Sequence, residues 1–144
     1  MKTRYTSLVS VKKNIMQRSE RALQAANANL NSAIAALEIS LSELATIEAP
    51  SSGKISDYLS SRVLLDAQRN LIKHNEEWVS FAKTQIKEAQ ERLKADMIEY
   101  EKFHYLDLEE IKEILRKRKI QEAKDLDEIA LMTYDKKNQG RKAS

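Results

Sequence analysis

Residues that interrupt helices are almost confined to one short segment of this 144-residue chain. Residues 48–54, with the sequence EAPSSGK, contain the only proline and one of the two glycines, and the other glycine is Gly140 near the end. Because both residue types disfavour helix interiors, the sequence predicts two long helices joined by one turn. We expect a single domain with helices at about 5–49 and 56–137, a turn at about 50–55 and a flexible tail at 138–144.

Apolar residues recur at intervals of seven along both predicted helices, which is the spacing of a coiled-coil seam. Charged residues make up 33% of the chain and aromatic residues only 6%, so a thin seam between helices fits better than a thick core. The repeat comprises Val9, Met16, Leu23, Leu30, Leu37 and Leu44 in the first helix and Tyr58, Leu65, Ile72, Val79, Ile86, Leu93 and Tyr100 in the second.

Folding the chain at the turn predicts an antiparallel register. Leu44 then faces Tyr58, and Leu37, seven residues earlier, faces Leu65, seven residues later, and so on along both helices. The midpoint of every pair is residue 51, within the turn. A second row would place Asn27 opposite Asn75. Either this buried polar pair fixes the register, or the edge of a two-stranded seam simply tolerates polar residues. In that row Lys13, Glu20, Asn27, Ile34 and Leu41 of the first helix face, in the same order, Ala89, Ala82, Asn75, Gln68 and Ser61 of the second.

The second helix outlasts the first by roughly 35 residues, or about 50 Å at the rise of an α-helix. The predicted fold is therefore all-α: a two-helix antiparallel coiled-coil hairpin with a long C-terminal helical overhang. An apolar stripe without an intramolecular partner indicates a binding partner outside the chain, and the alternative is a frayed end. The stripe comprises Phe103, Leu108, Ile111, Leu115, Ile120, Leu126, Ile129 and Met132.

The sequence offers no catalytic, cofactor-binding or metal-binding motif. Cysteine is absent, and His74 and His104 stand apart without ligand-like neighbours, so solvated positions are expected for both. We therefore expect no enzyme activity, no cofactor and no small-molecule substrate. No apolar run is long enough to cross a bilayer or to form a secretory signal, so the expected location is the cytoplasm.

Two surface features could bind a macromolecule. The basic run at 116–119 is either a solvated helix face or a contact for an acidic protein or nucleic acid. Acidic residues on both sides and the lack of interleaved aromatic residues weaken the nucleic-acid reading, so no nucleic acid is expected. The second feature is a flank of the second helix, where Leu71, Trp78 and Phe81 are candidate anchors for a protein partner.

Two segments resemble the flagellar export protein FliJ family. The start Arg4-Tyr5-Thr6-Ser7-Leu8-Val9, followed by Lys12-Lys13, is similar to the family's opening. Residues 118–131, RKIQEAKDLDEIAL, resemble its C-terminal signature of a basic, Glu-rich helix that ends in an Asp-Glu pair and apolar residues. The length and the single turn near one third of the chain also match. The resemblance covers essentially the whole chain.

The resemblance implies a soluble stalk of the flagellar type III export apparatus, similar to the gamma subunit of rotary ATPases. Such a stalk inserts into the hexameric export ATPase ring, FliI, promotes its assembly and activity, and contacts the export gate protein FlhA and export chaperones. It would lie in the cytoplasm, peripheral to the inner membrane through its partners. The implied ring interface comprises Tyr5, Leu8, Lys12, Leu115, Arg116, Lys117, Arg118, Lys119, Asp127, Glu128 and Leu131. For the gate interface we expect the candidate anchors Leu71, Trp78 and Phe81, which the resemblance itself does not assign.

Two other functions remain open at this level. The chain could be a coiled-coil adaptor or chaperone for secretion substrates that never touches an ATPase. It could also be a basic helical arm for nucleic acid, which a salt titration would reveal because phosphate binding weakens steeply as salt rises.

Overall fold

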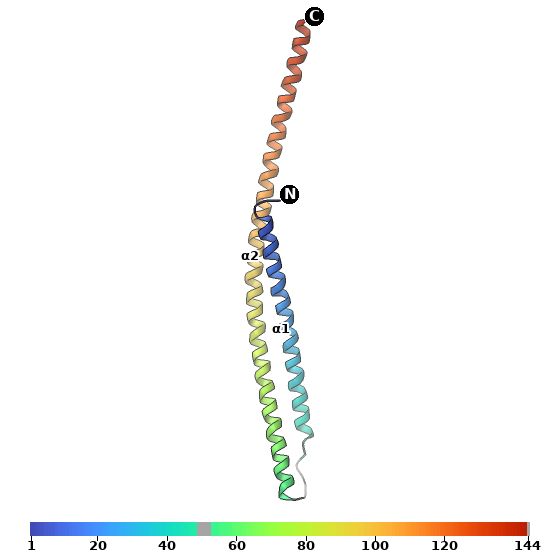
Figure 1. Ribbon diagram of the computed structural model, residues 1–144, viewed down its shortest axis with the longest axis vertical. Helices are drawn as coiled ribbons and strands as arrows, with labels where there is room; N and C mark the ends of the chain where they lie inside the picture. Colours follow the sequence, from blue (N-terminus) through green and yellow to red (C-terminus); the bar gives the residue numbers. More distant parts are fainter. Residues whose placement is uncertain (49–52, 144) are drawn as a thin grey trace. The chain divides into compact units, whose positions relative to one another are not determined.

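The computed structural model describes residues 1–48 and 53–143, with side chains as far as Gly140, and this part of the chain is helical without strands. Helix α1 spans Thr6–Thr46 and helix α2 spans Ile55–Ala143 (Figure 1). The predicted all-α class is therefore confirmed. Helix α1 ends before the predicted residue 49, and α2 continues to Ala143, so the predicted tail is helical up to that point. Residues 49–52, which include the first half of the predicted turn, lie outside the described residues.

The start of α2 depends on a glycine and a carboxylate. Gly53 adopts a φ of 153°, a conformation that residues with a side chain rarely take. The Asp57 carboxylate then accepts a hydrogen bond from the backbone N–H of Lys54 over 3.3 Å. This side chain satisfies one of the unpaired donors at the helix start and places negative charge at the positive end of the helix dipole. Gly53 and Asp57 together explain why α2 begins at Ile55.

The start of α1 is capped by the hydroxyls of Thr3 and Thr6, each of which accepts a hydrogen bond from a nearby backbone N–H. The N–H of Thr3 donates to Thr6 Oγ1 over 2.8 Å, and the N–H of Tyr5 donates to Thr3 Oγ1 over 3.0 Å. This reciprocal arrangement has the logic of a capping box, because each side chain satisfies a donor that the first helical turn leaves unpaired.

The chain divides into two compact units. The hairpin unit is Asn14–Ile98, and the terminal unit combines Met1–Lys13 with Glu99–Ser144. In the hairpin unit, α1 and α2 lie side by side (Figure 1). Ser19 hydrogen-bonds to Asp96 and Ser40 hydrogen-bonds to Asn75, so residues early in α1 meet residues late in α2. The two helices are therefore antiparallel, as the heptad pattern predicted.

The seam of the hairpin unit follows the predicted heptad rows only in part. The first row is half-buried or buried from Met16 to Leu44 in α1 and from Leu65 to Leu93 in α2. The second row of α2 is also buried or half-buried, as predicted. In α1 the prediction of the second row was wrong, because Lys13, Glu20, Asn27, Ile34 and Leu41 are all exposed and the positions one residue earlier, Ser19, Ala26, Ala33 and Ser40, face α2 instead.

Side-chain size explains why the second row of α1 lies one residue earlier than predicted. Residues three or four positions from the first row can both complete a seam, so periodicity alone does not choose between them. Ala33 and Ala82 are completely buried, with exposures of 0%, and Ser40 is almost so. Small side chains let the two helices approach closely, while Glu20 and Asn27 keep their polar groups in water.

The predicted register was also wrong. It placed Ser40 opposite Arg62 and Ser19 opposite Lys83. Instead, the Ser40 backbone carbonyl accepts from Gln68 Nε2 over 2.8 Å, its hydroxyl accepts from Asn75 Nδ2 over 3.2 Å, and Ser19 meets Asp96. In both units the pairing is displaced toward the C-terminal end of α2 by roughly ten residues. Asn27 therefore does not pair with Asn75, and Tyr58, predicted opposite Leu44, is exposed.

Neither helix, over its described residues, contains a stretch apolar enough to span a bilayer.

Candidate protein-binding surfaces

The terminal unit contains a long stretch of α2 that no other described part of the chain covers. From Leu115 to Gly140 every residue except Asn138 is exposed, and we call residues 115–140 the C-terminal arm. Side-chain pairs within the helix help to stabilise it, including Gln121 to Asp125 over 3.0 Å. Because isolated helices draw little stability from propensity alone, this arm has the properties of a binding element. Its large exposed apolar residues are Leu115, Ile120, Leu126, Ile129, Leu131, Met132 and Tyr134.

The predicted basic cluster lies at the start of the arm, and its four residues differ in their surroundings. Arg116 forms a bidentate pair with Glu113, with distances of 2.6 and 3.1 Å. That hydrogen bond lowers the pKa of the Glu113 carboxyl and raises the pKa of the Arg116 guanidinium. The ion pairs in the described part of the chain leave out the other three basic residues. Lys117, Arg118 and Lys119 are exposed, and the charge of Lys117 adds to the lowering of the Glu113 pKa.

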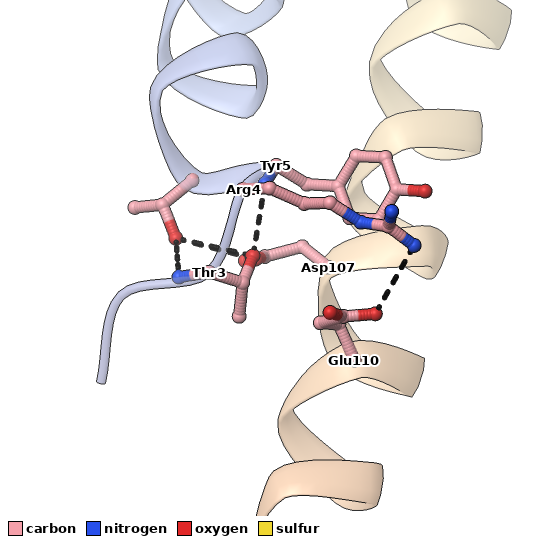
Figure 2. Close-up of polar contacts among 6 residues, drawn as sticks. Thr3, Arg4, Tyr5, Asp107 and Glu110 are labelled. Carbon is pink, nitrogen blue, oxygen red and sulfur yellow. Dashed lines mark hydrogen bonds and ion pairs between the residues drawn. The ribbon is translucent and has the colours of Figure 1, made fainter.

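The N-terminal segment is fastened to α2 by a polar cluster that Figure 2 shows. Thr3 Oγ1 donates to Asp107 Oδ1 over 2.5 Å, and Thr6 Oγ1 lies 3.3 Å from the same oxygen. Arg4 reaches Glu110 at 3.6 Å and covers the ring of Tyr5 at 5.0 Å. The two hydroxyls that cap α1 thus also bind the Asp107 carboxylate. We call Thr3, Thr6 and Asp107 the N-terminal clamp.

Sequence reasoning missed this clamp. Its one signal was the Thr3-x-x-Thr6 spacing of a helix start, which indicates a cap but not the carboxylate that the cap would bind. The clamp also shortens the predicted overhang, because the N-terminal residues reach Asp107 and Glu110.

The three N-terminal residues of the predicted ring interface are half-buried or paired within the protein. Tyr5 and Leu8 are half-buried. The Lys12 ammonium lies 3.5 Å from the Glu99 carboxylate and 5.6 Å from the centre of the Phe103 ring. Within the terminal unit these residues lie beside the part of α2 between Glu99 and Glu110. A partner could therefore contact only the parts of their side chains that are exposed.

The arm residues of the predicted ring interface lie farther along α2. Asp127, Glu128 and Leu131 are exposed. Twenty residues of helix separate Asp107 from Asp127, which corresponds to about 30 Å. The structure therefore does not bring the N-terminal and the distal predicted residues together into one patch. A partner that contacts both sets must extend along the helix.

The predicted gate residues share one flank of α2 in the hairpin unit. Leu71 and Phe81 are exposed, with 42% and 58% of their surface accessible, while Trp78 is half-buried. His74, Glu77, Trp78 and Phe81 line one shallow surface hollow. The structure thus brings Trp78 and Phe81 together beside His74, and Leu71 lies two turns earlier on the helix.

No group of three metal-ligating side chains lies close enough to hold an ion in the described part of the chain. His104 stacks on Tyr100, with ring centres 5.5 Å apart. The polar contacts of both units hold helices in place, and the exposed surfaces are apolar and charged side chains on helices. The antiparallel helices of the hairpin unit place the chain in the class of helical coiled-coil proteins.

The sequence comparison then gives the particular family. Residues 1–139 match the family described as flagellar FliJ protein, and the chain belongs to that family. Searches of curated proteins and of solved structures found no match. Family membership makes the chain a component of the flagellar export apparatus, a role exercised through protein partners.

Proposed function

We propose that this chain is the stalk of the flagellar export ATPase. The C-terminal arm inserts into the hexameric FliI-like ring, promotes its assembly and activity, and links it to a FlhA-like export gate. Membership of the FliJ family and the exposure of the arm support this proposal. Because apolar residues on a long helix lose contact with water only when another surface covers them, the arm requires an external partner.

The arm has two charged blocks that suit the inside of a ring. Lys117, Arg118 and Lys119 come first and would meet acidic or polar loops at the ring entrance. Asp127 and Glu128 follow, with Leu131 as an apolar anchor farther in. Leu115 and Arg116 lie at the base of the arm, where Tyr5, Leu8 and Lys12 add the surface of the N-terminal segment.

The gate contact is proposed for the flank that carries Leu71, Trp78 and Phe81. Aromatic side chains provide large contact areas at low cost in conformational entropy, which is why they often dominate binding energies. The chain would then associate with the membrane only through its partners, on the cytoplasmic side of the inner membrane. Export chaperones are a further class of partner for the same exposed surfaces.

The rate of ATP hydrolysis by the cognate ring ATPase tests the stalk proposal. We expect the full chain to raise this rate and the variant Leu131→Asp to lose most of the increase, because a charge would replace an apolar anchor in a dry contact. The matched control is Gln139→Asp, which adds the same charge two turns farther along the exposed helix. Equal stimulation by the wild type and Leu131→Asp would refute insertion of the arm.

A truncation separates the arm from the rest of the terminal unit. Ending the chain after Gln121 removes most of the arm but keeps Asp107, Glu110 and the Glu113–Arg116 pair. We expect loss of stimulation with an unchanged circular dichroism signal per remaining helical residue. Ending the chain after Asp135 should keep the stimulation.

A further inference from the structure

One face of the C-terminal arm has a self-complementary order of side chains. Leu115, Lys119, Glu122 and Leu126 follow at spacings of four, three and four residues. At about 100° per residue these four side chains fall within an arc of roughly 60°. All four are exposed, with 45% of Leu115 and 66% of Leu126 accessible. Read backwards, the face presents leucine, acid, base and leucine.

We propose that this face binds a second copy of the chain, with the two arms antiparallel. Leu115 of one copy then packs on Leu126 of the other, and Lys119 of one copy meets Glu122 of the other. The twofold axis lies between residues 120 and 121, so each contact occurs twice. Such an interface is isologous, the commonest kind in closed dimers.

The charges favour the antiparallel orientation over the parallel one. In antiparallel helices, residues on the same flank of the seam face each other, and Arg118 and Asp125 share a flank. Arg118 of one copy therefore meets Asp125 of the other. A parallel pair would instead align Lys119 with Lys119 and Glu122 with Glu122, which like-charge repulsion disfavours.

The charged groups of this face are available for the contact. The ion pairs within the described part of the chain involve Arg4, Lys12, Lys112 and Arg116, and leave Arg118, Lys119 and Glu122 out. Asp125 accepts one hydrogen bond from Gln121 and keeps its other oxygen. The hollow beside the face is lined by Lys112, Leu115, Arg116, Arg118, Lys119 and Glu122, so it would receive side chains of the other copy.

The apolar part of the interface is short, and the dimer should therefore be weak. Beyond the two leucine contacts, Ile129 of one copy faces the aliphatic stem of Lys112 of the other. Contacts of this size belong to the transient class of protein interfaces. The inference does not depend on the proposed function. If the stalk proposal holds, the ring and the second copy would compete for the same arm.

Sedimentation equilibrium of the full chain tests the proposal. We expect the average mass to rise from 16.6 kDa toward twice that value as the concentration increases from about 5 to 300 µM. Lys119→Glu and Glu122→Lys should each abolish the rise, because each variant aligns like charges. An equimolar mixture of the two variants should restore it, because opposite charges then face each other. The control Lys124→Glu changes a charge on the opposite face and should associate like the wild type.

Single cysteines test the orientation, since the chain has none of its own. A mixture of Leu115→Cys and Leu126→Cys should form a disulfide-linked dimer under mild oxidation, and each variant alone should not. A wild type that stays monomeric throughout the concentration range would overturn the proposal. So would a mixture of charge variants that fails to associate, or faster cross-linking of Leu115→Cys with itself than with Leu126→Cys.

Discussion

Asn75 of α2 donates a hydrogen bond from Nδ2 to the Ser40 hydroxyl of α1 over 3.2 Å, and both side chains are buried in the seam. The same amide donates to the backbone carbonyl of Ala36 over 3.2 Å, and the Ser40 hydroxyl donates to the carbonyl of Leu37. These bonds satisfy the buried polar groups at this level. A heptad seam alone permits pairings displaced by seven residues, so the bonds of Asn75 select one of them.

Asn75→Leu should raise the melting temperature while loosening the register. The apolar side chain adds buried area and removes the need to satisfy an amide, but it also removes the contact that distinguishes one pairing from the next. Disulfide formation can report the register, because the chain lacks cysteine.

The reporter pair for the observed register is Ala26→Cys with Ala89→Cys, two positions that border the same surface hollow. Ala33→Cys with Ala89→Cys reports the pairing displaced by one heptad. In the native background only the first pair should close, and with Asn75→Leu both should. Closure of the first pair alone in both backgrounds would show that Asn75 does not set the register.

Asp107→Ala should release the start of α1 from α2. The carboxylate accepts from the hydroxyls of Thr3 and Thr6, and hydrogen bonds to a charged group contribute about 1.5–3 kcal/mol. We expect amide hydrogen exchange of the first turn of α1 to accelerate by about tenfold or more, since about 1.4 kcal/mol corresponds to a factor of ten. Glu109→Ala is the control, because among the described residues Glu109 pairs with Lys112 of its own helix turn and not with α1. Equal protection of the first turn of α1 in both variants would show that the clamp does not hold this turn against α2.

Gly53→Ala should destabilise the start of α2. An added Cβ would lie 2.8 Å from the Asp57 carboxylate oxygen, and the φ of 153° is unfavourable for alanine. Strain of this kind costs about 1–3 kcal/mol. The internal control is Gly140→Ala, where no atom lies within 4 Å of the new Cβ and helix propensity favours alanine by about 1 kcal/mol. The two substitutions should therefore change helicity in opposite directions, and a loss in both would contradict the role of the Gly53 conformation.

The Glu113–Arg116 pair should make the base of the arm sensitive to acid. The hydrogen bond from Arg116 lowers the pKa of Glu113 below its ordinary value of 4.5. The stabilisation is therefore fully present above pH 4.5 and is lost as the pH falls through the lower pKa of the folded chain. A carbon-detected NMR titration should give a Glu113 pKa that returns toward its ordinary value in Arg116→Gln. An unchanged pKa in that variant would show that the pair does not form in solution.

The near-confinement of proline and glycine to one segment predicted the two helices. The heptad repeat predicted the first row of the seam, because apolar burial at intervals of seven is a local property of each helix. It could not predict the register, since Leu37 finds an apolar neighbour whether Leu65 or Ile72 stands opposite. The observed register depends on single polar contacts such as Ser19 with Asp96 and Ser40 with Asn75. The clamp of Thr3, Thr6 and Asp107 escaped prediction for the same reason, because these residue types are common on helix surfaces. The roles of the arm and of Trp78 stay predictions.

The buried apolar residues of the described chain are Ala33, Ile72 and Ala82, of which two contribute only a methyl group. A seam of that kind leaves a small free energy difference between the native and the unfolded chain. Occupied binding surfaces add to that difference by mass action. Molecules without a partner should then be removed first by cellular proteases, so the abundance of this chain should follow the abundance of whatever it binds.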